Sequence, residues 1–322
     1  MHRWEKLGRV LAPGDVDAEW MQEYAQAPAA LVRDDHVRVY FSCRPPADAR
    51  GQFTSRLAYV DLDRTNLFTK RRFSAKPVLE LGDRGTFDEF GTNPASVIQH
   101  DDEVWMYYAG WSRCESVPFN AAIGLAISRD RGETFARLGS GPVLSYSIDE
   151  PFVIGSPRIR RFNGVWYLWY VAGKRWIRSG GRPEPVYRIR MASSSDGISW
   201  HKEGRDLLDW QLDEDECQAS PDVFELDGTY HMYFSYRYCV GFQARDRGYR
   251  IGSARSRDLL HWTREDGEAG LRTSAEGWDS ETVSYPHVFR LDDTLYMLYQ
   301  GNHVGRTGFG LARMATPSVA SA

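Results

Sequence analysis

Short stretches of alternating apolar and polar residues recur along the chain at a nearly constant interval. In the clearest copy, DGTYHMYFS at 227–235, an Asp-Gly turn leads into a strand rich in aromatic residues. Each such strand follows a short apolar run and an Asp or Asn turn, so we expect it to be the second arm of a β-hairpin. These second strands are predicted at 37–41, 104–108, 165–170, 230–234 and 295–299.

A proline before each hairpin fixes the period of the repeat. Pro28, Pro94, Pro157, Pro221 and Pro286 are 66, 63, 64 and 65 residues apart. A third strand is predicted at 56–60, 123–127, 188–192, 250–254 and 309–313, and a fourth follows an aromatic residue at Phe68, Phe135, Trp200 or Trp262. So regular a period indicates repeated copies of one supersecondary unit, and four antiparallel strands per unit are typical of a propeller blade.

The fifth unit ends after its third strand, and the missing strand is predicted at the N-terminus. Trp4 in HRWEKLG matches Trp200 in SWHKEG, so a strand over 2–10 should complete the last blade and close the ring. The sequence therefore predicts an all-β, five-bladed β-propeller with four antiparallel strands per blade, as one domain over 1–322. The blades are expected at approximately 21–73, 88–140, 150–205, 215–267 and 281–314, with the closing strand at 2–10.

Composition and charge narrow the function classes. The 40 basic and 44 acidic residues are mixed along the chain, giving a net charge of −4 and no basic stripe for nucleic acid. There is no run of 18 apolar residues and no apolar leader after MHRWEKLG, so we expect a cytoplasmic protein without a membrane partner. The four cysteines form no CxxC motif, which favours free thiols over a zinc site. Oligomeric state is not set by these features.

Two motifs resemble a known group of enzymes. SPDVFELDGTYHMYFS at 220–235 and SSDGISW at 194–200 are similar to the five-bladed propellers of glycoside hydrolase families 43, 62, 32, 68 and 130. The resemblance covers nearly the whole chain. It implies a carbohydrate or glycan as the ligand, held in a central funnel where the first strands of the blades begin. It implies no required cofactor, although some family 43 enzymes hold a structural calcium beside a fifth-blade histidine, here His287.

The expected ring of carboxylates at the funnel departs from that family pattern. The families place a catalytic acid directly before a proline, where this chain has Ala27, Asn93, Ser156, Ser220 and Tyr285. The acids lie a few residues upstream instead, at Glu23, Asp88, Glu89, Glu150, Glu216 and Glu281.

Two interpretations of these acids stay open. Cleavage of a glycosidic bond ordinarily uses two carboxyl groups. In the first interpretation Glu216 is the general acid, Glu23 is the base or orients water, and Glu150 tunes both. Asp222, which should face the channel, is held in reserve, while Asp88, Glu89 and Glu281 contact substrate hydroxyls. In the second interpretation the acids are structural and cap backbone N–H groups or pair with arginines.

A second ring follows the second strands and is basic or aromatic. We expect it to bind substrate through Arg44, Trp111, Arg113, Lys174, Arg237 and His303. Guanidinium groups favour an anionic ligand, such as phosphate or a sugar carboxylate. The sequence thus predicts a glycoside hydrolase. The alternatives are a phosphate-dependent glycoside phosphorylase or sugar-phosphate-handling enzyme, and a non-hydrolytic propeller that binds a sugar or serves biosynthetic chemistry.

Overall fold

The fold was taken from a computed structural model that describes residues 3–315. Within these residues, twenty strands form five antiparallel sheets of four strands each. The innermost strands, each of which begins with the residues around a repeat proline, are β2 (Glu23–Val32), β6 (Thr92–His100), β10 (Ile154–Phe162), β14 (Cys217–Leu226) and β18 (Ser284–Leu291). The five-bladed propeller predicted from the repeat is confirmed.

The remaining strands follow the predicted order outward through each blade. The second strands are β3 (His36–Arg44), β7 (Glu103–Arg113), β11 (Val165–Ser179), β15 (Thr229–Arg237) and β19 (Thr294–Gln300). The third strands are β4 (Arg56–Asp63), β8 (Phe119–Ser128), β12 (Arg182–Ser194), β16 (Arg250–Ser256) and β20 (Phe309–Met314). The outer strands are β5 (Lys70–Phe73), β9 (Ala136–Arg137), β13 (His201–Lys202), β17 (Thr263–Arg264) and β1 (Trp4–Leu11). Three short helical turns, η1 (Glu19–Met21), η2 (Asp266–Glu268) and α1 (Asn302–Gly305), lie in loops.

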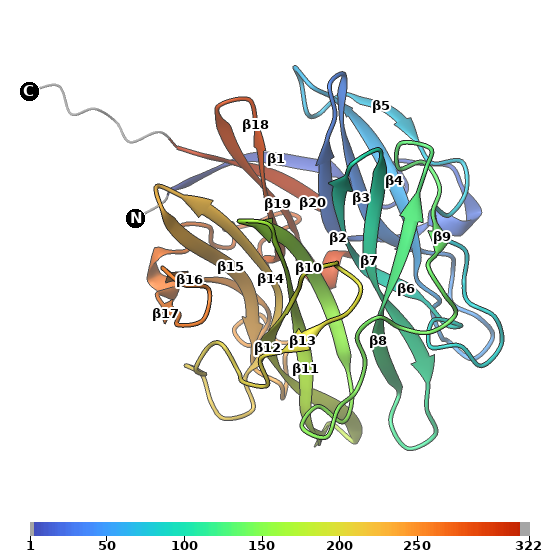
Figure 1. The fold of residues 1–322 in the computed structure, drawn as a ribbon, viewed down its shortest axis with the longest axis vertical. Coiled ribbons are helices and arrows are strands. Elements are labelled where there is room, and N and C mark those ends of the chain that lie inside the picture. The colour runs from blue at the N-terminus through green and yellow to red at the C-terminus, as the bar shows by residue number, and fades with distance from the viewer. Residues whose placement is uncertain (1–2, 316–322) are drawn as a thin grey trace, which may run out of the picture.

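The N-terminal strand closes the ring, as predicted. β1 pairs antiparallel with β20 and is the outer strand of the last sheet, so the blue and red ends of the chain lie together in Figure 1. Trp4 also reaches the preceding blade, where its indole N–H donates a hydrogen bond of 3.0 Å to the Tyr233 hydroxyl. The strand was expected over 2–10 and is observed over Trp4–Leu11, with residues 1 and 2 outside the described part.

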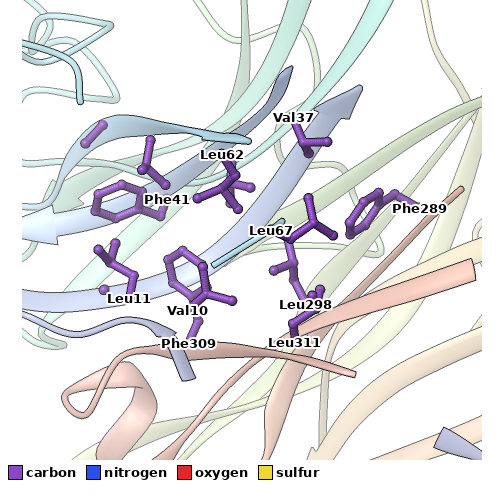
Figure 2. Packing of buried hydrophobic residues seen from close by; sticks show 14 of the residues in the cluster. Val10, Leu11, Val37, Phe41, Leu62, Leu67, Phe289, Leu298, Phe309 and Leu311 are labelled. Carbon is purple, nitrogen blue, oxygen red and sulfur yellow. The ribbon is translucent and has the colours of Figure 1, made fainter. Parts of the chain in front are cut away.

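Adjacent blades are held together by apolar side chains from their facing surfaces. Between the first and last blades, Val37 and Phe41 of β3 belong to one buried cluster with Phe289 of β18, Leu298 of β19 and Leu311 of β20 (Figure 2). Most aromatic residues of the second strands are buried in clusters of this kind. The alternation seen in the sequence therefore serves contacts on both faces of each sheet.

A salt bridge recurs in all five blades. In each blade, a cation on the outer strand, two residues after the repeated aromatic, pairs with an acid in the loop that enters the blade. The pairs are Lys70–Asp15, Arg137–Asp88, Lys202–Glu150, Arg264–Glu216 and Lys6–Asp279. In three blades a second-strand tyrosine also donates to the acid, through Tyr108, Tyr170 and Tyr299. The loop on the funnel side is thereby tied across its own sheet.

Candidate functional site

A cavity opens where the inner strands begin. Its volume is about 210 Å³, and residues from all five blades line it. The first blade contributes Gln26 and Arg44, the second Asn93 and Trp111, and the last Tyr285. These positions lie one or two residues before the repeat prolines or within the last three residues of the second strands, near where the two predicted rings were expected to meet.

A β-bulge in every inner strand aims residues at this cavity. The pairing register shifts at the repeat proline in β2, β6, β10, β14 and β18. In four of them the residue before the proline has a positive φ: Ala27 (52°), Ser156 (47°), Ser220 (49°) and Tyr285 (53°). Such backbone is rare for residues other than glycine and gathers at functional sites, and bulges re-aim side chains. Ser235 stabilises the bulge at Tyr285, because the Tyr285 N–H donates a hydrogen bond of 2.7 Å to the Ser235 hydroxyl.

Two arginines line the cavity without a carboxylate partner. Arg44 makes no side-chain hydrogen bond or ion pair with any residue that the structure describes, and its guanidinium rests 4.2 Å from the centre of the Tyr24 ring. Burial lowers the pKa of Arg44. Arg237 is 4% exposed and donates only to neutral groups, namely the carbonyls of Tyr238 and Cys239 and the Tyr187 hydroxyl.

Two tyrosines place these cations relative to each other. Tyr285 interacts electrostatically with both Arg44 and Arg237, and all three residues line the cavity. Tyr187 is held by a 2.5 Å hydrogen bond between its hydroxyl and that of Tyr249. Buried guanidinium groups that lack a counter-ion favour an anionic ligand, because they lose hydration without gaining a carboxylate.

Glu184 is the only carboxylic acid that lines the cavity among the described residues. It lies on the long β11–β12 hairpin, opposite Ile177, and the hairpin packs over the rim through Trp176 against Phe119 and Phe152. Burial raises the pKa of the Glu184 carboxyl, and the nearby Arg237 opposes part of that rise. A carboxyl group with a raised pKa is suited to donate a proton.

The rest of the lining combines an aromatic wall with unpaired polar atoms. Trp111 and Phe119 pack against each other with ring centres 4.5 Å apart, and both face the cavity. The side-chain oxygen of Gln26 is buried without a hydrogen-bond partner, as is the Nε of Arg237. An apolar surface facing a few convergent polar groups is typical of a small-molecule site.

Asp222 and His287 lie on the inner strands in a buried network. The Asp222 carboxylate is 2.5 Å from Arg160, 3.4 Å from Arg158 and 3.2 Å from His287. Burial raises the pKa of Asp222, but Arg160 and Arg158 outweigh burial and hold it below its usual range. Asp222 is 0% exposed and does not line the cavity, so the structure gives it a counter-ion role.

The surroundings of His287 do not fit a calcium ion. The guanidinium of Arg158 lies 2.8 Å from His287 Nδ1, a position that would repel a cation. Burial and Arg158 lower the pKa of His287 to about 4. No group of three or more His, Cys, Asp or Glu side chains within residues 3–315 is arranged to hold a metal ion.

The acids predicted to open into the funnel are placed elsewhere. Asp88, Glu150 and Glu216 are 0–1% exposed, do not line the cavity and belong to the salt bridges that recur in the blades. Glu216 accepts from Arg264, Gln218 and two backbone N–H groups, so its oxygens are fully engaged. This geometry favours the structural interpretation of these three acids.

The other predicted residues lie on the surrounding loops or in the cavity. Glu23 pairs with Arg306 at 3.5 Å, and Glu281 with His303 at 3.6 Å, both in partly exposed positions. Glu89 accepts from the backbone N–H of Gly85. Arg113 lies 3.7 Å from Asp48, and Lys174 lies 3.3 Å from Asp206.

Of the predicted set, the residues that line the cavity are Arg44, Trp111 and Arg237.

The sequence did not single out Glu184 or Tyr285 as functional. A signal for Glu184 was present, because it is the only acid in the insertion KRWIRSGGRPEPVYR that lengthens this hairpin. Tyr285 occupies a position where the other repeats carry small or amide residues.

Comparison with solved structures defines the fold. A glycoside hydrolase structure matches with a TM-score of 0.73 and 18% identity, over 98% of this chain and 93% of that one. A structure from glycoside hydrolase family 130, described as mannoside phosphorylases that include hydrolases of β-1,2 mannosidic linkages in Candida mannan, matches with a TM-score of 0.71 and 17% identity over 100% and 96% of the chains. The chain has the five-bladed propeller fold of these enzymes.

Sequence comparison identifies the family more closely. An uncharacterised protein of Mycobacterium tuberculosis (strain H37Rv) is 34% identical over 311 residues, which are 96% of this chain and 98% of that protein. The chain belongs to the same family. A 1,2-β-oligomannan phosphorylase of Thermoanaerobacter sp. (strain X514) is 28% identical over 202 residues, or 61% of this chain and 59% of the enzyme. No family model matches the chain. No helix among the described residues is long and apolar enough to cross a membrane.

Proposed function

We propose that the protein is a carbohydrate-active enzyme that transfers a glycosyl unit to inorganic phosphate. The observation that carries the proposal is the charge content of the cavity, which has one carboxylic acid, Glu184, and two arginines without acidic partners, Arg44 and Arg237. Hydrolysis, which the sequence favours, ordinarily needs two carboxyl groups about 5–9.5 Å apart on either side of the scissile bond. The cavity lining supplies one such group.

The proposed reaction needs one proton donor and a bound nucleophile. Arg44 and Arg237 bind the phosphate through charge-assisted hydrogen bonds. Glu184 gives its proton to the glycosidic oxygen as the bond from that oxygen to the anomeric carbon breaks. A phosphate oxygen bonds to the same carbon, so the products are a sugar 1-phosphate and a shortened saccharide. The proton that leaves the phosphate restores the acid form of Glu184 and completes the balance.

The shape of the lining supports a sugar as the other ligand. Trp111 and Phe119 offer an apolar wall, and Gln26, whose side-chain oxygen is unpaired, and Asn93 add polar groups to the lining. A volume of about 210 Å³ lies below the roughly 300–1,000 Å³ of drug-sized ligand sites, which suits one sugar ring within the cavity. Similarity to the Thermoanaerobacter oligomannan phosphorylase adds independent support for phosphorolysis.

The test is to incubate the protein with β-1,2-linked manno-oligosaccharides and other neutral oligosaccharides, with and without phosphate. We expect sugar 1-phosphate to form only when phosphate is present, and Arg44→Ala to reduce its formation strongly. Arg178→Ala is the matched control, since Arg178 is exposed near the tip of the β11–β12 hairpin that carries Glu184 and does not line the cavity. Equal release of free reducing sugar with and without phosphate would establish hydrolysis and reject the proposal.

A further inference from the structure

A second depression lies beside the cavity, on the rim of the first blade. This rim cleft has a volume of about 700 Å³ and is open to solvent. Trp20 and Pro45 supply its apolar part. Its polar part comes from Glu19, Gln22, Arg56 and Glu80. None of these residues lines the cavity that contains Glu184.

The rim cleft and the cavity share a wall made by the ends of β2 and β3. Arg44 lines the cavity and the next residue, Pro45, lines the cleft. Consecutive Cα atoms are about 3.8 Å apart, so the linings of the two sites are adjacent at this point of the chain. Gln22, directly before β2, borders the cleft, and Gln26 within β2 borders the cavity. We therefore expect a chain that extends from the cavity past Arg44 and Pro45 to reach the cleft.

The Trp20 side chain is held in place by packing, and its remaining surface lines the cleft. Part of its ring packs on the buried cluster of the first blade. Its helical turn, η1, is fixed by a 2.9 Å hydrogen bond from the Met21 N–H to the Ala18 carbonyl. The indole N–H makes no hydrogen bond with any residue in 3–315, and it remains available to a ligand. Tryptophan thus offers a rigid apolar face with a polar edge.

The polar groups of the rim cleft are also available and suit hydroxyl groups. Glu19 and Gln22 make no side-chain hydrogen bond within the described residues, and Arg56 makes only a 3.5 Å contact with Glu80, whose side chain is 70% exposed. Carboxylate, amide and guanidinium groups can each bind adjacent hydroxyls with two atoms. Two acids against one base leave a net negative charge, which disfavours anionic sugars.

We propose that the rim cleft binds the next units of a neutral oligosaccharide whose terminal ring occupies the cavity. This inference rests on the proposed function. It adds that the substrate is a neutral chain of several sugars, stacked on Trp20, and that the anion bound by Arg44 and Arg237 is phosphate and not a charged sugar.

The test measures affinity against chain length by calorimetry, with mannose and β-1,2-linked manno-oligosaccharides of two to five units, in the absence of phosphate so that the ligands are not consumed. We expect the wild type to bind longer chains more tightly, and Trp20→Ala to lose about tenfold in affinity for the longer chains only. Trp210→Ala is the control, because Trp210 is 53% exposed and lines neither site. Gln22→Ala serves as a second, less disruptive cleft variant.

The outcomes separate the two proposals. If the wild type binds sugars with no dependence on chain length, or if Trp20→Ala and Gln22→Ala keep the wild-type dependence, the cleft proposal is wrong and the proposed function stands. If no saccharide binds and no sugar 1-phosphate forms, the proposed function fails, and the cleft proposal fails with it. Tighter binding of an acidic oligosaccharide than of its neutral counterpart would overturn the assignment of a neutral chain.

Discussion

Arg264 donates a 2.7 Å hydrogen bond to Glu216 within the fourth blade, where the two side chains are 5% and 0% exposed. Because this contact ties a loop to the outer strand, we expect Glu216→Gln to act on stability. Loss of one partner of a buried pair typically costs about 3 kcal/mol. Urea denaturation should show the loss, while kcat/KM for phosphorolysis changes less than about twofold. A large fall in kcat in a fully folded variant would return Glu216 to the catalytic role that its sequence position suggested.

Glu184→Gln should abolish most of the activity without weakening the fold. Removal of a general acid typically lowers the rate by about 10²- to 10⁴-fold. The variant keeps the size and polarity of the side chain, so its unfolding midpoint should match that of the wild type. Comparable kcat values in the two proteins would eliminate Glu184 as the proton donor.

The pH profile should identify the same group independently. Glu184 must be protonated to act, so activity is present below its raised pKa and lost as the pH rises through it. Arg237 opposes that raised pKa, and therefore Arg237→Ala should shift the alkaline limb to higher pH. Arg237→Lys keeps the positive charge and should leave the limb closer to its wild-type position. An alkaline limb that is the same in all three proteins would contradict the assignment.

Arg44→Ala should raise the KM for phosphate more than the KM for saccharide. Hydrogen bonds to charged groups contribute enough to change affinity by about 10- to 100-fold. Arg44 has no carboxylate partner, so its removal leaves no uncompensated charge in the fold. Initial rates at varied phosphate and fixed saccharide would measure the effect. Equal changes in both KM values would indicate a general loss of cavity shape instead.

His287 should make the fold less stable in mild acid. Its pKa is 6.5 when unfolded and about 4 when folded, so the unfolded chain binds the proton more readily between these values. Its contribution is complete above pH 6.5 and declines by roughly 3 kcal/mol as the pH falls to about 4. Asp222, Arg158 and Arg160 face His287, and Asp222 and Arg158 keep their charges throughout this window.

Urea midpoints between pH 7 and 4 would test this prediction. His287→Gln should flatten the dependence, and the exposed His201→Gln should leave it unchanged. Parallel curves for all three proteins would show that other groups govern the acid response.

The sequence was sufficient for the fold because the repeat carries its own register. Which residues pair is fixed by three features of each repeat: a proline in the inner strand, an Asp or Asn turn, and an aromatic second strand. The match of Trp4 to the repeated aromatic predicted the closing strand. The cavity was less predictable. Acids such as Glu150 recur with the repeat because their partners recur with it, as Lys202 shows, and this regularity made structural groups look like a functional ring.

The residues that do line the cavity depend on geometry that no short motif records. The bulge before Pro286 determines where Tyr285 points. Glu184 reaches the cavity only because its hairpin folds over the rim through Trp176. Both effects arise from contacts between blades, which a short sequence motif cannot predict.

The pairing of β1 with β20 sets an order of events during synthesis. Glu5 meets Arg313, 308 residues later in the chain, so β1 must wait for the synthesis of all the strands between them before it finds its partner. Four blades can form from contiguous segments meanwhile, whereas the last cannot. Until β20 emerges, the apolar side of β1, with Val10 and Leu11, stays uncovered and prone to association, and a nascent chain would need protection at this strand above all others.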